Sequence, residues 1–228
     1  MKTIGLIGGV SWVSTQEYYR RLNVMAHERH GGMTSAKVLL SSVNFEDILP
    51  FQESGDEEGE RELLLRHALT LEKAGADVVL ICSNTTNKTA DDLGQRLKVP
   101  VVNIVEAIAA RIVALGYRRV GLLGTKHVMY GDFFTAILRK HGIEVVVPPQ
   151  DEGGRINEII YQELVQNRFV EESSRFIRSA IANLAGHEVE AVILGCTELP
   201  LAVRGEAEGG LPLIDSIQVH LDAVSDYL

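Results

Sequence analysis

Three short strand-like segments in the first half of this chain recur, in the same order, in the second half. The matching pairs are residues 4–8 (IGLIG) with 120–124 (VGLLG), 78–85 (VVLICSNT) with 191–198 (AVILGCTE), and 99–103 (VPVVN) with 211–215 (LPLID). Repeated segments of this kind, spaced by about half the chain, favour a duplicated α/β unit over a solenoid. The predicted fold class is therefore α/β, with two parallel-sheet halves.

The segment 191–198 predicts a buried strand that ends at a functional edge. Four apolar residues run into Gly195, and Cys196, Thr197 and Glu198 follow. In an open α/β sheet, ligands bind beyond the carboxyl ends of the strands, so we expect Cys196 at the mouth of a pocket. The ungapped alignment of 78–85 with 191–198 makes Ser83, and not Cys82, the counterpart of Cys196.

The segments between these strands read mostly as helices. Ser14 is predicted as the N-cap of a helix to about Glu28, because Glu17 follows at the capping-box spacing. Residues 44–59 are polar and contain Pro50, so we expect a loop or a broken helix, and the acidic run 53–62 reads as a solvated surface. The other expected elements are strands at 2–9, 36–43, 78–81 and 99–104 and helices at 60–74 and 88–97.

The repeat suggests where the two halves begin and end. We expect residues 1–99, joined by 211–228, to form the first half and 100–210 the second. If the halves face each other, Ser83 and Cys196 reach the two sides of one cleft. Clefts between domains are a preferred place for small ligands.

Composition excludes several classes of function. The net charge of −9, from 22 Lys and Arg against 31 Asp and Glu, argues against a nucleic-acid partner. No apolar run approaches the 18 residues of a membrane span, and the first residues do not resemble a signal peptide, so we expect a cytoplasmic protein. Two cysteines are too few for a disulfide framework, and the histidines share no metal-ligand spacing. The Gly8–Gly9 turn lacks the dinucleotide fingerprint.

A thiol at a strand end suits proton transfer. An unperturbed cysteine has a pKa of about 8.5, close enough to neutral to give and take protons. Two such groups on opposite sides of a planar carbanion could remove a proton from one face and return it to the other. The counterpart of Cys196 is Ser83, whose hydroxyl is a far weaker base unless another group activates it. Taken alone, Cys196 could also be a buried apolar residue, as we expect for Cys82.

Six motifs make the chain resemble the aspartate/glutamate racemase family, which also includes the hydantoin racemases. The motifs are GLIGGVSWVST (5–15), NFEDI with Gln52 (44–52), SNT (83–85), LLGT (122–125), RINEIIYQEL (155–164) and GCTE (195–198). The resemblance implies two Rossmann-like halves related by a pseudo-twofold axis, with the active site in the cleft between them. It also implies racemisation without pyridoxal phosphate or any other cofactor, a small anionic amino-acid substrate, and a homodimer.

The resemblance also assigns roles to residues. Cys196 matches the second catalytic cysteine of the family, and Ser83 occupies the position of the first. The positions implied for substrate binding are Val10, Ser11, Gln52, Asn84, Thr85, Thr125, Arg155, Thr197 and Glu198. Arg155 lies where aspartate-type members usually carry a lysine, and Asn87 lies where many members carry a histidine. No metal ligand is implied.

Ser83 leaves three functions open. The first is a racemase for aspartate or glutamate whose two directions are unequal, with Cys196 the competent base for one enantiomer. The second is a decarboxylase or cis-trans isomerase that uses a single thiol on the same scaffold. The third is a binding protein that senses an acidic amino acid and has lost catalysis.

Overall fold

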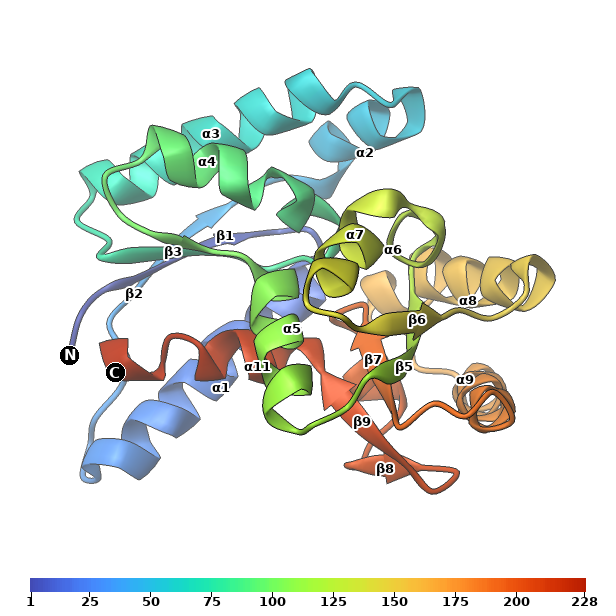
Figure 1. Ribbon diagram of the computed structural model, residues 1–228. Coiled ribbons are helices and arrows are strands. Elements are labelled where there is room, and N and C mark those ends of the chain that lie inside the picture. The colour runs from blue at the N-terminus through green and yellow to red at the C-terminus, as the bar shows by residue number, and fades with distance from the viewer. The chain divides into compact units, whose positions relative to one another are not determined.

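The computed structural model describes residues 1–228, and their contacts divide the chain into two units. The first unit comprises residues 1–103 and 220–228, and the second comprises residues 104–219. Each unit has its own sheet with helices on both faces (Figure 1). Both units are therefore α/β layers, as the sequence predicts.

The sheet of the first unit has four parallel strands in the order β2-β1-β3-β4. The strands are β1 (Ile4–Gly8), β2 (Val38–Ser42), β3 (Val78–Ile81) and β4 (Val101–Val102). The central strands β1 and β3 are entirely buried, because helices cover both of their faces. Ile7, Val79 and Ile81 pack against α3 and α4 on one face, and α1 lies on the other (Figure 1).

The helical segments that complete the first unit connect these strands. They are α1 (Trp12–His30), α2 (Phe45–Ser54), α3 (Glu57–Lys73), the 3₁₀ turn η1 (Thr85–Thr89), α4 (Ala90–Arg96) and the 3₁₀ turn η3 (Ser225–Tyr227). Ser11, and not Ser14, is the N-cap of α1, since its hydroxyl accepts from the amide of Val13 at 3.2 Å. Residues 45–54 form a helix despite Pro50, because Asn44 caps it and Ile48 is buried beneath it.

The second unit has a five-stranded sheet in the order β6-β5-β7-β9-β8, parallel except for β8. Its strands are β5 (Arg119–Gly124), β6 (Glu144–Val146), β7 (Ala191–Gly195), β8 (Ala207–Glu208) and β9 (Leu211–Asp215). Alternate residues of β7 face opposite layers: Val192 belongs to one apolar cluster and Ile193 to the other.

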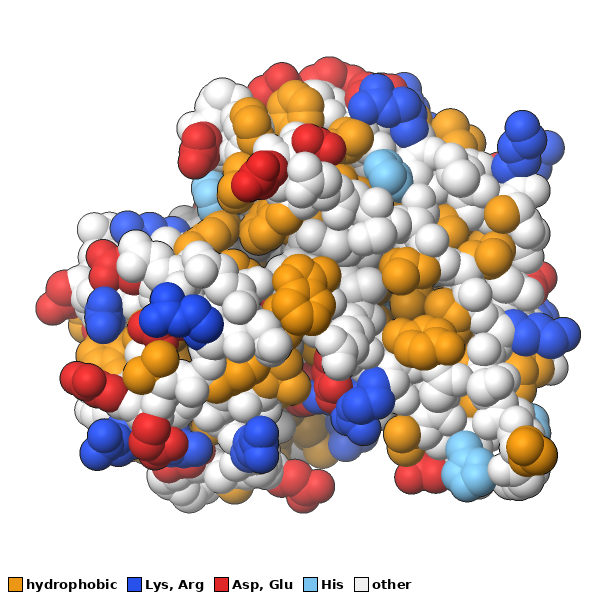
Figure 2. Space-filling view, turned by 180° about the vertical axis from the view of Figure 1, so that it is seen from behind, with side chains coloured by type: hydrophobic (Ala, Val, Ile, Leu, Met, Phe, Trp, Pro, Cys, Tyr) orange, Lys and Arg blue, Asp and Glu red, His pale blue; other side chains and the backbone are white.

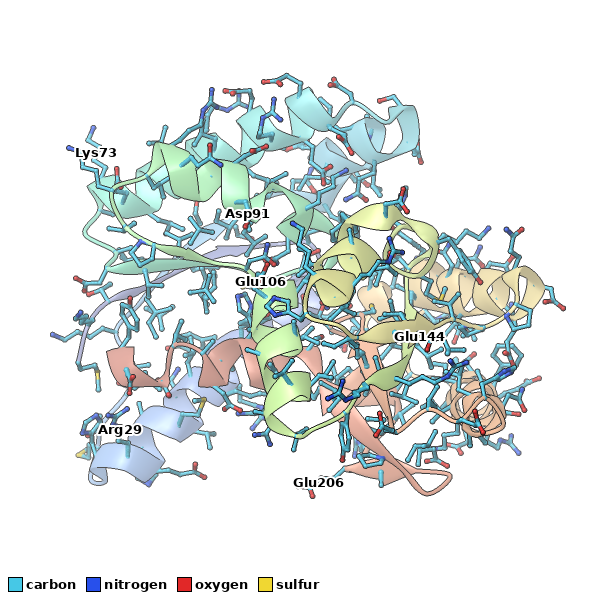
Figure 3. All side chains as sticks on the ribbon, viewed as in Figure 1. Arg29, Lys73, Asp91, Glu106, Glu144 and Glu206 are labelled. Atoms are coloured by element: carbon cyan, nitrogen blue, oxygen red, sulfur yellow. The ribbon has the colours of Figure 1, made fainter.

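Helices cover both faces of this second sheet. The helical segments are α5 (Ile104–Ala114), α6 (Lys126–Tyr130), α7 (Asp132–Lys140), α8 (Gln150–Gln162), η2 (Leu164–Gln166), α9 (Glu171–Ala185), α10 (Leu199–Ala202) and α11 (Ser216–Asp222), whose residues 220–222 belong to the first unit. Helices α8 and α9 supply one apolar cluster, and α5 and α7 supply the other. The two carboxylates Glu106 on α5 and Glu144 on β6 (Figure 3) pair with His141 and Arg119 at the surface.

The registers of the two sheets reproduce the sequence repeat residue by residue. Ile4 pairs with Val78 in the first sheet, and their counterparts Val120 and Ala191 pair in the second. The fourth strands agree as well, because Val79 pairs with Val101 while Val192 pairs with Leu213. Strands β1, β2, β3 and β4 thus correspond to β5, β6, β7 and β9, which supports a duplicated unit.

The unit boundaries differ from the expected ones. Residues 211–219 were expected with the first half, but Leu211–Asp215 is the strand β9 and pairs with β7. Residues 100–103 were expected in the second half, but Val101 and Val102 pair with β3. The repeat explains both differences, since each of these segments is the fourth strand of its own sheet.

Two further observations concern the helices and one face of the molecule. None of the helices is long and apolar enough to cross a bilayer. Acidic and basic side chains are interspersed on the face shown in Figure 2, which shows no broad basic area.

Candidate functional site

The predicted residues of the first unit lie after adjacent strands of its sheet. Val10 and Ser11 follow β1, and Ser83, Asn84 and Thr85 follow β3, which pairs with β1. The hydroxyl of Ser14 lies 3.0 Å from the carbonyl of Ser11 and 3.1 Å from the carbonyl of Cys82. Ser14 thus joins the loops after the two strands, which explains why a serine inside α1 is buried.

Gly9 makes the turn after β1 unusually tight. Its φ is +92°, and a Cβ at this position would lie 1.9 Å from the carbonyl oxygen of Val43. Its amide donates to the hydroxyl of Thr15 at 2.8 Å. Only glycine combines this backbone conformation with so close an approach of another chain segment.

The Ser83 hydroxyl is hydrogen-bonded to a backbone amide and not to a side-chain base. This hydroxyl is buried and lies 3.5 Å from the amide of Thr86, at the limit of a hydrogen bond. Asn87, where many relatives were expected to carry a histidine, donates from Nδ2 to the carbonyls of Ser83 at 2.6 Å and Ile81 at 3.0 Å. Asn87 therefore holds the backbone of this loop, and nothing in the first unit activates the Ser83 hydroxyl as a base.

Gln52 lies in a buried polar cluster that the sequence motifs did not indicate. Its Nε2 donates to Oε1 of Glu60 at 3.1 Å, and Oε2 of Glu60 lies 2.8 Å from Nζ of Lys88. Glu60 is fully buried, although the acidic run 53–62 predicted a solvated surface. The prediction was wrong for Glu60 because Lys88, 28 residues further on, reaches it from η1.

The predicted residues of the second unit also follow adjacent strands. Thr125 follows β5 and caps α6, accepting from the amide of Val128 at 3.3 Å, and Cys196 follows β7. Gly124 and Gly195, which immediately precede Thr125 and Cys196 in the sequence, pair with each other in the sheet. A Cβ on either glycine would approach the neighbouring backbone to 2.9 Å, so these glycines let the two strand ends lie close together.

The Cys196 thiol is held against a carboxylate. Its Sγ lies 3.0 Å from Oε2 of Glu198, and the hydroxyl of Thr197 donates to the same oxygen at 3.0 Å. All three side chains are buried. Burial raises the pKa of the Cys196 thiol well above its usual range, and the negative charge of Glu198 raises it further. The resting group is thus a thiol with a proton acceptor in contact.

Two other predicted groups have different surroundings. Arg155 lies on the exposed side of α8 and pairs with Glu158 at 3.2 Å, and its side chain is 53% exposed. Two residues along α8, Asn157 accepts from the amide of Lys126 at 2.9 Å and so fixes α8 to the loop after β5.

Cys82 is buried, and burial alone raises the pKa of its thiol, which suits a core residue.

The chain is similar to proteins of one known family along most of its length. The profile of the Asp/Glu/hydantoin racemases matches residues 7–224, which is nearly the whole chain. The chain belongs to this family. A broad specificity amino-acid racemase from Bacillus subtilis is 25% identical over 174 residues, covering 76% of this chain and 74% of that protein. A glutamate racemase from Deinococcus radiodurans is 24% identical over 205 residues, covering 82% of this chain and 67% of that protein.

Solved structures of the family extend the comparison. A proposed Asp/Glu racemase from Yersinia pestis is 38% identical with a TM-score of 0.89, covering 100% of this chain and 99% of that one. An aspartate racemase homologue from Pyrococcus horikoshii is 34% identical with a TM-score of 0.85, covering 99% and 98% of the two chains. The family resemblance and the α/β fold class expected from the sequence are therefore confirmed.

In this racemase family member, the candidate site residues fall into two groups by chemistry. The carboxyl edge of the first sheet carries hydroxyls and amides, with Ser83 at the strand end, while that of the second carries a thiol and a carboxylate. Sequence reasoning missed Glu60 and Lys88. The one available signal was an acidic residue in the first turn of an amphipathic helix, which is ordinarily solvent-exposed.

Proposed function

We propose that this chain is an amino-acid racemase, needing no cofactor, that acts on aspartate or glutamate by moving a proton at Cα. The observation that carries the proposal is the buried Cys196 thiol against Glu198, at the strand-end position equivalent to Ser83 in the other repeat. The relatives named above as racemases support the same reaction class.

The reaction we propose begins with a proton transfer within the second unit. Glu198 accepts the proton of the Cys196 thiol, which leaves a thiolate. The thiolate removes the Cα proton of the substrate, and the electron pair of the broken C–H bond stays on Cα and spreads into the α-carboxylate. A proton delivered to the opposite face of Cα then gives the other enantiomer. A positioned acid or base typically contributes about 10²–10⁴-fold to such a step.

The second proton donor in this scheme is the Ser83 hydroxyl or a water molecule in its place. Ser83 has only the backbone amide of Thr86 within reach of its oxygen, so it can donate a proton but is a poor base. We therefore propose that the two directions of racemisation are unequal. The enantiomer whose Cα proton faces Cys196 should react faster.

The groups proposed to bind the substrate match its charges. Hydroxyl and amide donors of Asn84, Thr85 and Thr125 suit the α-carboxylate, and Thr197 can add its hydroxyl in exchange for Glu198. The backbone after β1 at Val10 and Ser11 lies at the same sheet edge as Ser83. The guanidinium of Arg155 can bind the side-chain carboxylate in a bidentate way, in exchange for Glu158.

Exchange in heavy water tests this proposal. Each enantiomer of aspartate and glutamate is incubated with the protein in D₂O, and loss of the Cα proton is followed by NMR. We expect exchange with at least one substrate, faster for one enantiomer, and its loss in Cys196→Ser. Cys82→Ser is the matched control, since Cys82 is equally buried but lacks a carboxylate partner. Binding without exchange would instead indicate an amino-acid sensor.

A second candidate function rests on the presence of a thiol at only one of the two equivalent positions, Cys196 and not Ser83. A decarboxylase or cis-trans isomerase needs one thiol, and Cys196 without a cysteine partner satisfies that requirement. Release of carbon dioxide from a substituted malonate, or isomerisation of maleate, with no Cα exchange of aspartate or glutamate, would favour this function.

A further inference from the structure

The buried cluster of Gln52, Glu60 and Lys88 links three elements of the first unit. Gln52 belongs to α2, Glu60 to the first turn of α3, and Lys88 to η1, which follows the Ser83–Thr85 loop. Glu60 is fully buried, and Gln52 is 9% exposed. Lys88 also lies 3.7 Å from the exposed Glu57, so its ammonium is shared between two carboxylates.

Glu60 dictates which end of the Gln52 amide faces it. A carboxylate paired with an ammonium group only accepts hydrogen bonds, so the amide must turn its NH₂ group toward Glu60, as the 3.1 Å contact records. The opposite orientation would set the carbonyl oxygen of Gln52 against a carboxylate oxygen. The ion pair with Lys88 thus fixes a choice that an isolated glutamine leaves open.

The carbonyl oxygen of Gln52 is left without a partner. Oε1 is buried and accepts no hydrogen bond. A buried acceptor without a donor is costly, and such atoms in a folded protein commonly await a ligand or a water. Because Oε1 can only accept, the missing partner is a donor. A carboxylate cannot fill this role.

We infer that Glu60 and Lys88 are positioning residues that lock Gln52 as an acceptor for the substrate's ammonium group. This inference rests on the proposed function, in which the substrate is an amino dicarboxylate. Two of its three charged groups are carboxylates that only accept, so the ammonium group is the one that donates to Oε1. Gln52 then distinguishes aspartate from dicarboxylates that lack an amine, such as succinate.

The test compares the binding of aspartate and of succinate by isothermal titration calorimetry. The variants are Glu60→Gln, Gln52→Met and the double variant. Glu60→Gln keeps the shape but no longer dictates the orientation of Gln52. We expect aspartate affinity to fall about 10- to 100-fold, the range for a hydrogen bond to a charged group, with succinate affinity unchanged. The double variant should bind aspartate no more weakly than Gln52→Met, because Glu60 acts through Gln52.

Two further variants keep the test decisive. Lys88→Met removes the ammonium group without touching either α-helix, and it should lower aspartate affinity in the same selective way even if Glu60→Gln folds poorly. Arg61→Gln is the matched control, because Arg61 joins α3 to Asp92 of α4 in an exposed ion pair at 3.2 Å. It should leave both affinities unchanged.

Several outcomes would overturn the inference. Equal losses for aspartate and succinate would mean that the cluster only supports the fold, and losses that add in the double variant would mean that Glu60 acts independently of Gln52. If the unmodified protein exchanges the Cα proton of aspartate yet Glu60→Gln keeps its preference over succinate, the inference fails and the racemase proposal stands. If the unmodified protein neither binds nor exchanges aspartate or glutamate, both fail.

Discussion

Sγ of Cys196 lies 3.0 Å from Oε2 of Glu198, and both groups are buried at the carboxyl end of β7. At the equivalent end of β3, Ser83 has only a backbone amide at 3.5 Å. The two repeats thus share their strand registers. The strand β7 is followed by an acid–base pair, whereas the equivalent strand β3 is followed by a hydroxyl alone.

Replacing Glu198 by glutamine should lower the pKa of the Cys196 thiol. Burial is the larger cause of the raised pKa and remains, but the negative charge that adds to it is removed. We expect the pH midpoint of iodoacetamide alkylation to fall by about one unit or more in this variant. Measuring it in the Cys82→Ala background ensures that only Cys196 reports. An unchanged or higher midpoint would contradict the contact.

Ser83→Cys should make the two directions of the proposed reaction more equal. A thiol has a pKa far closer to neutral than a hydroxyl, so it can both remove and return a proton. We expect Cα exchange of the slower enantiomer in D₂O to rise by about 10²-fold, with little change for the faster one. Ser14→Cys, in the first turn of α1 beside the Ser83 loop, is a control that should not equalise the rates.

Acid should destabilise the protein through His220. This imidazole is fully buried; the Tyr18 hydroxyl donates to Nδ1 at 2.8 Å, and Nε2 donates to the carbonyl of Val102 at 2.9 Å. Burial lowers the pKa of His220 from 6.5 to about 4. Between these values the unfolded chain binds more protons than the folded one, so stability falls as pH falls from about 6.5 toward 4.

The size of this effect can be measured by urea unfolding. We expect about 3 kcal/mol of the free energy of unfolding to be lost over that range because of His220. His220→Gln should lower stability at neutral pH but flatten the pH dependence, and His27→Gln, on the exposed side of α1, should leave the slope as it is. A slope that persists in His220→Gln would refute the assignment.

Comparing Gly9 with Gly75 distinguishes two causes of destabilisation when a glycine is replaced, backbone strain and steric collision. Both have a positive φ, +92° and +97°, but a Cβ on Gly9 would collide with the carbonyl of Val43, whereas a Cβ on Gly75 meets nothing within 4 Å. Gly75→Ala should cost about 1–2 kcal/mol of unfolding free energy from backbone strain alone. Gly9→Ala should cost several kcal/mol more, and equal costs in thermal or urea unfolding would contradict the close approach.

The sequence repeat predicted the sheets better than the helices. Aligning 78–85 with 191–198 anticipated the paired positions of both sheets, because buried parallel strands are short, apolar and fixed in register. The start of α1 was misplaced because Ser11 and Ser14 are both suitable caps, and only the contact of Ser14 with Cys82 shows that its hydroxyl is engaged elsewhere. Asp91 (Figure 3), which accepts from Asn103 at 3.1 Å, likewise joins segments that no local pattern connects.

The sequence indicated those candidate site residues that directly follow a strand, but not those that lie elsewhere. Cys196 and Ser83 stand out because each follows an apolar run in a repeated motif. Glu60 could not be found in this way, since its burial depends on Lys88, a residue distant in sequence whose ammonium group offsets the cost of enclosing a charge. Ion pairs between residues far apart in the sequence produce no periodic pattern from which they could be predicted.

The hydrogen bond between His220 and Val102 has a consequence for the architecture of the whole chain. It joins Val102, two residues before the 104–219 segment begins, to His220, the first residue after that segment ends. Residues 104–219 are therefore an insertion into the first unit, and the two points where the chain leaves and re-enters that unit are joined by a hydrogen bond. The first unit then needs to bridge only a short distance between these points, and its strands keep their positions. Loss of the hydrogen bond between His220 and Val102 would loosen both connections between the two units.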